Sequence, residues 1–194
     1  MDALNLLWFH WIADGSTQHG LLFWLAVRIA LGASWLSVAL MAWAAWRQPA
    51  ERVYFVAVCL LAAASGMLAH ALAAAWNLPR PFMVGLSPDW LGHGSRAAMP
   101  STHATVMFTV ALCFLWRRRL RPTGVALAGL ALLTGWARIY LGVHFPFDVL
   151  AGVLLAAMLA AGLAGASLLV RQLLAARPAR LPQARRTLSR PGSQ

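Results

Sequence analysis

The chain has 194 residues, of which 61% are hydrophobic and only 11% are charged. This is one domain's worth of sequence with too little polar surface for a globule in water, so a water-soluble enzyme is excluded. All 16 Lys and Arg residues are arginine, against five acidic residues, and the net charge is +11. Because the arginines gather at the ends of apolar runs and not along one stripe, we expect a membrane protein and no nucleic-acid binding.

The predicted elements begin with a short aromatic segment, residues 3–12, which is rich in Trp and Phe but too short to cross a bilayer. It suits a helix lying in the membrane interface as a surface anchor. Since a membrane-crossing helix needs roughly 20 apolar residues, five later segments qualify: 20–46, 53–77, 100–116, 124–141 and 147–170. The sequence therefore predicts an all-α integral membrane protein, a bundle of about five transmembrane helices with a short N-terminal interfacial helix.

The chain ends in a segment of different composition. Residues 176–194 mix arginine with proline and have little apolar surface, so we expect a disordered tail after one membrane-embedded domain, residues 1–175. Cys59 and Cys113 lie inside apolar segments without zinc-type spacing, and they are interpreted as small core residues.

Five spans place the termini on opposite sides of the membrane, and the arginines indicate which side is which. Twelve lie on the side of the tail: Arg47, Arg52, Arg117, Arg118, Arg119, Arg121, Arg171, Arg177, Arg180, Arg185, Arg186 and Arg190. This excess predicts a cytoplasmic C-terminus. The two arginines on the other side, Arg80 and Arg96, are not explained by topology and need another role.

Counting the membrane crossings in the same way places three polar blocks at this second membrane face. The first contains Arg80-Pro81, the second is Pro100-Ser101-Thr102-His103, and the third runs from Arg138 through His144 to Asp148. The residues are separated by up to 68 positions, counted from 80 to 148. Their convergence at one face predicts a site.

The third block has the local geometry of a histidine oriented by a carboxylate. Pro146 suits a first helical turn, which would hold Asp148 in that turn with His144 just before it. The carboxylate can then reach one ring nitrogen, and the other nitrogen is presented as a nucleophile or base.

The second block begins a predicted helix at Ser101, a plausible N-cap residue. Helix N-termini bind phosphate through free amides and the positive end of the dipole. Since the third and fifth spans both begin at this face, two such termini are expected to converge with Arg80 and Arg138, whose guanidinium groups match phosphate oxygens.

Together the three blocks resemble the signature of the type 2 phosphatidic acid phosphatase superfamily, over about residues 53 to 170. The resemblance implies that His144 is the nucleophile that forms a phosphohistidine, Asp148 its partner and His103 the acid for the leaving oxygen. Phosphate binding is expected from Arg80, Arg138, Ser101, Thr102 and Arg96. Ser101 and Thr102 would bind phosphate either through their side chains or through their backbone amides alone. Arg96 would either contact phosphate or be a solvated loop residue.

Two departures from the family pattern point to one branch. Ala73 stands where the pattern often has lysine, and Thr102 where it has glycine. The segment from Arg80 to His93 is similar to that of the bacterial undecaprenyl-pyrophosphate phosphatases, which also lack the lysine.

This resemblance implies hydrolysis of undecaprenyl diphosphate to undecaprenyl phosphate and inorganic phosphate, for recycling of the peptidoglycan lipid carrier. The site would face the periplasmic or extracellular side of the bacterial inner membrane. The expected partners are a lipid phosphate substrate and membrane lipids. No metal or other cofactor is expected, since arginines supply the positive charge and no carboxylate cluster is present.

Alternatives remain at this point. The same site would serve a phosphatase of phosphatidylglycerophosphate, phosphatidic acid or lipid A, and a non-catalytic phosphate-binding protein or transporter could keep the same fold. The oligomeric state and the roles of Arg28, His70 and the tail stay open.

Overall fold

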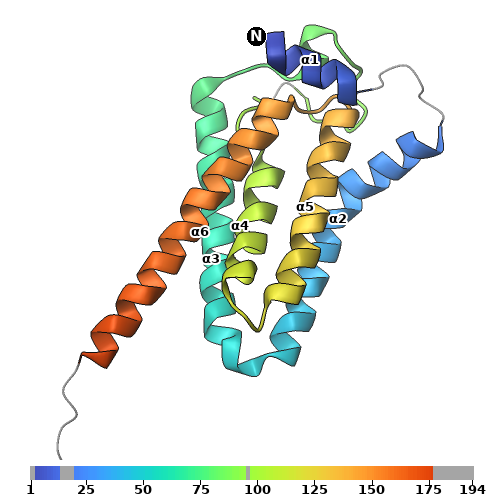
Figure 1. The fold of residues 1–194 in the computed structure, drawn as a ribbon. Coiled ribbons are helices and arrows are strands. Elements are labelled where there is room, and N and C mark those ends of the chain that lie inside the picture. Colours follow the sequence, from blue (N-terminus) through green and yellow to red (C-terminus); the bar gives the residue numbers. More distant parts are fainter. Residues whose placement is uncertain (1–2, 14–19, 95–96, 177–194) are drawn as a thin grey trace, which may run out of the picture.

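The computed structural model describes residues 3–13, 20–94 and 97–176. The described chain is helical, as expected, and the helices run up and down in one bundle (Figure 1). The elements are α1 (Ala3–Ile12), α2 (Leu21–Arg47), η1 (Pro49–Glu51), α3 (Arg52–Trp76), η2 (Pro81–Val84), α4 (Thr102–Trp116), α5 (Arg121–Tyr140) and α6 (Pro146–Ala175). The predicted tail beyond residue 176 lies outside the described residues.

Four helices, α2, α3, α5 and α6, are long and apolar enough to cross a membrane. The remaining predicted span corresponds to α4, which has 15 residues and a rise of about 22 Å. It lies among α3, α5 and α6 (Figure 1), and nine of its residues are buried. Because protein covers this helix, α4 forms the centre of the bundle, and the prediction of an all-α membrane bundle is confirmed.

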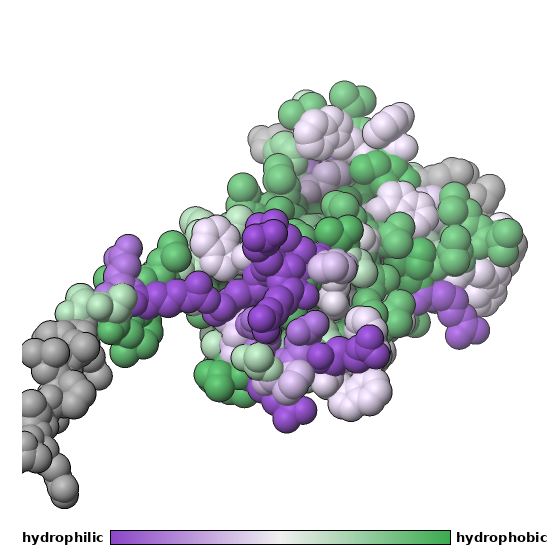
Figure 2. Space-filling model, turned by 60° about the horizontal axis from the view of Figure 1, so that its bottom comes forward, coloured by the Kyte–Doolittle hydropathy of each residue, from purple (hydrophilic) through white to green (hydrophobic). Residues whose placement is uncertain are grey.

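The bundle has a polar end and apolar flanks. Figure 2 shows hydrophilic side chains gathered at the end opposite α1, where short connections join α2 to α3 and α4 to α5. Arg117 is part of this end, where it lies 3.8 Å from a Glu51 carboxylate oxygen and over the ring of Tyr54. The flanks carry exposed large apolar residues, as in a protein surrounded by lipid.

Helix α1 packs on the end of the bundle in addition to carrying the apolar side chains predicted for a surface anchor. Asn5 Oδ1 accepts a hydrogen bond from the backbone N–H of Phe147 at 3.1 Å, and the buried Phe9 ring lies 5.3 Å from that of Phe145. Leu7 and Trp11 remain exposed on the opposite side. Thus α1 covers the end of the bundle where α6 begins (Figure 1) and keeps apolar side chains for the interface.

Candidate active site

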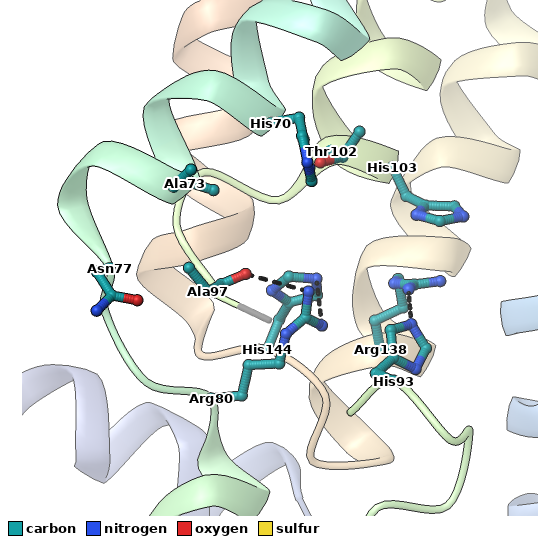
Figure 3. Close-up of a pocket in the computed structure, with 11 residues that line it drawn as sticks. His70, Ala73, Asn77, Arg80, His93, Ala97, Thr102, His103, Arg138 and His144 are labelled. Atoms are coloured by element: carbon teal, nitrogen blue, oxygen red, sulfur yellow. Dashed lines mark hydrogen bonds between the residues drawn. The ribbon is translucent and has the colours of Figure 1, made fainter. Parts of the chain in front are cut away.

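A cavity of about 480 Å³ opens at the end of the bundle covered by α1 (Figure 3). We call it the main cavity, and its lining comes from α3, the loop before α4, the first turn of α4, the last turn of α5 and the loop after α5. The lining residues are His70, Ala73, Ala74, Asn77, Arg80, His93, Ala97, Thr102, His103, Arg138 and His144. None of these described lining residues is acidic, whereas two are arginine, so the cavity suits an anion.

His144 is buried, with 2% of its surface exposed, and it contacts Asp148 as the sequence predicts. Its Nδ1 lies 3.3 Å from Asp148 Oδ2, and the same oxygen accepts the backbone N–H of Phe145 at 2.8 Å. Since the carboxylate can only accept when ionised, Nδ1 carries the proton and Nε2 keeps its lone pair. The first turn of α6 therefore orients the imidazole with Nε2 toward the main cavity.

The electrostatic surroundings favour the neutral form of this ring. Burial lowers the pKa of His144 well below its usual value of 6.5, and the positive charges of Arg80 and Arg138 lower it further. The imidazole is consequently neutral at neutral pH, which is the form that can act as a nucleophile.

Arg80 is held at the cavity wall by backbone carbonyl groups. Its Nη1 donates to the carbonyl of Val143 at 3.4 Å and lies 3.5 Å from His144 Nε2, while Nη2 donates to the carbonyl of Ala97 at 3.2 Å. Only 8% of the residue is exposed. The guanidinium group is thus fixed directly beside the proposed nucleophilic nitrogen.

Arg138, with 2% of its surface exposed, lies at the end of α5. Its Nη2 contacts His93 Nε2 at 2.6 Å, and its Nε has no hydrogen-bond partner among the described residues. The Asp89 carboxylate accepts the backbone N–H groups of His93 and Gly94 at 3.0 and 3.1 Å, which shapes this loop. Asp89 therefore positions His93 on Arg138.

Sequence reasoning assigned His93 no role at the site. The signal that could have placed it is local. Asp89 lies four residues before His93, and glycines lie directly before and after His93. This pattern is typical of a tight turn closed by an aspartate side chain. Gly92 and Gly94 indeed have φ values of +64° and +61°.

The first turn of α4 brings Thr102 and His103 to the main cavity. Ser101 is the N-cap residue by position, as predicted, but its side chain makes no cap hydrogen bond. Its Oγ is fully buried without a partner among the described residues, and the residue does not line the cavity. Of the two hydroxyl residues, only Thr102 reaches the cavity.

The N-termini of α4 and α6 are adjacent, since the backbone N–H of Ser101 donates to the Asp148 carbonyl at 2.9 Å. The expectation that both termini offer free amides to phosphate is nevertheless wrong. At α6 the amide of Phe145 is taken by Asp148 and that of Phe147 by Asn5. Only the α4 terminus contributes to the cavity wall.

The α3 side of the main cavity contains residues to which sequence reasoning assigned no role. His70, Ala73, Ala74 and Asn77 follow the spacing of one helix face and line the cavity together. Ala73, which replaces the lysine of the family pattern, thus lies at the site. Arg96, the remaining phosphate-binding prediction, lies outside the described residues.

Comparison with known proteins identifies a family and several similar proteins. The model of the PAP2 superfamily matches residues 54–171. The chain is 36% identical over 109 residues to the putative undecaprenyl-diphosphatase YbjG of Escherichia coli (strain K12), which covers 56% of this chain and 54% of that protein. It is 36% identical over 78 residues to the undecaprenyl-diphosphatase BcrC of Bacillus subtilis (strain 168), covering 40% of this chain and 39% of that protein.

These matches span about half or less of the length of the two relatives. Among solved structures, that of Aquifex aeolicus LpxE is similar, with a TM-score of 0.59 and 28% identity. This alignment covers 82% of this chain and 93% of that chain, so the similarity extends over most of the bundle.

Proposed function

The chain belongs to the PAP2 superfamily, and from this premise we propose that it is a membrane lipid-phosphate phosphatase whose substrate is undecaprenyl diphosphate. The products would be undecaprenyl phosphate and inorganic phosphate. The observation that carries the proposal is a neutral, carboxylate-oriented His144 that lines one cavity together with two buried arginines. The names of the relatives YbjG and BcrC support the choice of substrate.

In the first step, the Nε2 lone pair of His144 attacks the terminal phosphorus. A bond forms between nitrogen and phosphorus, and the bond from phosphorus to the bridging oxygen breaks. His103 donates a proton to the departing lipid phosphate. Asp148 stabilises the positive charge that develops on the His144 ring through Nδ1.

In the second step, water attacks the phosphohistidine and His103 takes a proton from that water. The bond between nitrogen and phosphorus breaks, inorganic phosphate leaves, and His144 returns to its neutral form. During both steps Arg80, Arg138 and the first amides of α4 stabilise charge on the equatorial oxygens. We include Arg96 as a ligand of the second phosphate of the substrate.

We further propose that residues 1–175 form one phosphatase domain in the bacterial inner membrane. The main cavity would face the periplasmic or extracellular side and the C-terminus the cytoplasm. The support is the distribution of arginines, which favours a cytoplasmic location for the end of the bundle opposite α1.

The alternative within the same class is a lipid monophosphate, such as phosphatidylglycerophosphate, phosphatidic acid or the phosphate of lipid A. Ala73 favours the diphosphate. Without the lysine, the site has one cation fewer to help an alkoxide leave, whereas a lipid phosphate is a better leaving group. The presence of both His103 and His144 disfavours a non-catalytic phosphate-binding protein or transporter.

A substrate panel tests the proposal. The purified full chain in detergent is incubated with equal concentrations of undecaprenyl diphosphate, phosphatidylglycerophosphate, phosphatidic acid and lipid A, and released phosphate is measured. We expect the highest kcat/KM with undecaprenyl diphosphate. Preference for a monophosphate would transfer the proposal to the alternative, and no release from any substrate would contradict a phosphatase.

A further inference from the structure

A second opening of the site lies on the side of α2. A groove of about 460 Å³ is shared between the first turn of α4, the end of α5 and one stripe of α2. We call it the α2 groove. Its residues from α2 are Ala30, Leu31, Ser34, Trp35 and Val38, whose spacing of one, three and four residues places them on one helix face.

The α2 groove adjoins the main cavity. His93, His103 and Arg138 line both, whereas His144 lines only the main cavity. In Figure 3, His103 and Arg138 lie on the far side of the pocket from Ala73, with His144 between the two sides. An occupant of the groove would therefore begin at His103 and extend away from the nucleophile.

The chemistry requires the lipid to leave in this direction. In phosphoryl transfer the attacking and leaving atoms lie roughly in line on opposite sides of phosphorus. When His144 Nε2 attacks from one side, the leaving oxygen and the chain attached to it must lie on the other side, beside His103. The α2 groove begins at that place.

The two openings differ in character. On the α3 side the main cavity is lined by the polar residues His70 and Asn77 together with small alanines. On the α2 side the wall adds three large apolar side chains, Leu31, Trp35 and Val38, to the small residues Ala30 and Ser34, and the three are more than half exposed. An apolar chain gains by covering the second surface, while the first suits water and released phosphate.

Trp35 is also unusual in its depth. Interfacial tryptophans lie near the ends of membrane helices, but Trp35 is 14 residues after Leu21 and 12 before Arg47, with 76% of its surface exposed. From Ala30 to Val38 the helix rises about 12 Å across its own midpoint, since α2 runs from Leu21 to Arg47. The stripe, which is apolar except for Ser34, therefore leads from the site into the membrane interior.

From these observations we propose that the α2 groove binds the apolar chain of the lipid phosphate substrate next to the leaving phosphate. This inference rests on the proposed function. It assigns a substrate-binding role to α2, which lies outside the residues matched by the family model. Specificity for a long chain is then determined by α2, and specificity for phosphate by the three motif blocks.

Substrates of different chain length test this assignment. The full chain and its variants are assayed with undecaprenyl diphosphate and with dimethylallyl diphosphate, whose five-carbon chain covers much less of the groove. Trp35→Ala removes a wall of the groove, and Ser34→Phe fills it. We expect kcat/KM for the long substrate to fall about tenfold or more in both variants, with the short substrate changed less than twofold.

Matched controls lie on the same helix outside the groove. Trp46→Ala removes an equally large exposed ring near the other end of α2, and Gly32→Phe adds a ring where a Cβ meets no atom within 4 Å. Both controls should keep the wild-type ratio of long to short kcat/KM. An unchanged ratio in Trp35→Ala and Ser34→Phe, or the same loss on both substrates, would overturn the assignment.

Crosslinking provides an independent measurement that does not depend on variants. A diphosphate with a photoreactive benzophenone in its isoprenoid chain is irradiated with the wild-type protein, and labelled peptides are identified by mass spectrometry. We expect adducts within residues 30–38. Adducts within residues 70–77 and none on α2 would overturn the assignment. Absence of hydrolysis of any lipid phosphate by the wild-type chain would instead contradict the proposed function.

Discussion

A Cβ atom on Gly152 of α6 would lie 2.9 Å from the backbone carbonyl oxygen of Ser101, at the start of α4. It would also lie 3.0 Å from the Cβ of Ala104. Only glycine permits this approach, one turn after Asp148 on α6. The contact therefore holds the helix that carries Asp148 against the helix that carries His103.

We expect Gly152→Ala to separate the two helix ends and to lower both stability and activity. Because backbone atoms must move, the loss of stability should be about 1–3 kcal/mol, and kcat should fall at least tenfold. Thermal unfolding in detergent and steady-state rates measure the two effects. Gly162→Ala on the same helix is the control, since its Cβ meets no atom within 4 Å. Equal behaviour of the two variants would contradict the packing argument.

The proposed roles of the two histidines predict different losses. His144→Ala should abolish turnover and prevent formation of an acid-labile phosphoprotein. His103→Ala should lower the rate by about 100 to 10,000 fold, which is the usual contribution of a general acid. Rates and acid-quenched labelling with a radioactive terminal phosphate measure both. If His144→Ala kept near-normal activity, the assignment of the nucleophile would be wrong.

Ala73→Lys should broaden the substrate range. Ala73 lines the main cavity on α3, so a lysine there would supply the cation of the family pattern. We expect kcat/KM for phosphatidic acid to rise about tenfold relative to that for undecaprenyl diphosphate, because charged hydrogen bonds contribute on this scale. Ala75→Lys, at an exposed position outside the cavity, is the control. A similar change in both variants would indicate a general effect of charge.

Arg96→Ala tests the second phosphate. We expect catalytic efficiency on undecaprenyl diphosphate to fall more than that on a lipid monophosphate, by roughly 1.5 to 3 kcal/mol, the scale of a charged hydrogen bond. The measurement is the ratio of kcat/KM for the two substrates in the wild-type and variant proteins. An equal loss on both would argue against Arg96 as a ligand of the second phosphate.

The proposed orientation predicts opposite labelling of the two ends of the bundle. Single cysteines replace Met83 in η2 and Arg118 in the connection from α4 to α5, both exposed, in a background lacking Cys59 and Cys113. In intact cells an impermeant thiol reagent should label position 83 and leave position 118 unmodified until the membrane is opened. Labelling of position 118 from outside would reverse the topology.

Much of the fold followed from the sequence alone. The length of each apolar run determines whether a segment can cross a membrane, and this property is local to the segment. The contact of His144 with Asp148 was equally predictable, because the two residues are only four positions apart and a proline at the first helical position restricts the backbone between them. The convergence of Arg80, His103 and Arg138 at one membrane face was also predictable, because it depends only on the number of spans between them.

The tertiary structure alone decided the contacts between distant segments. The backbone N–H of Phe147 donates a hydrogen bond to Asn5 Oδ1, 142 positions earlier, and this contact removes the α6 terminus from phosphate binding. The contact of His93 with Arg138 and the path along Trp35 depend on which faces of the helices meet. Nearly uniform apolar composition does not encode those faces, because in a membrane helix the side toward lipid and the side toward protein are both hydrophobic.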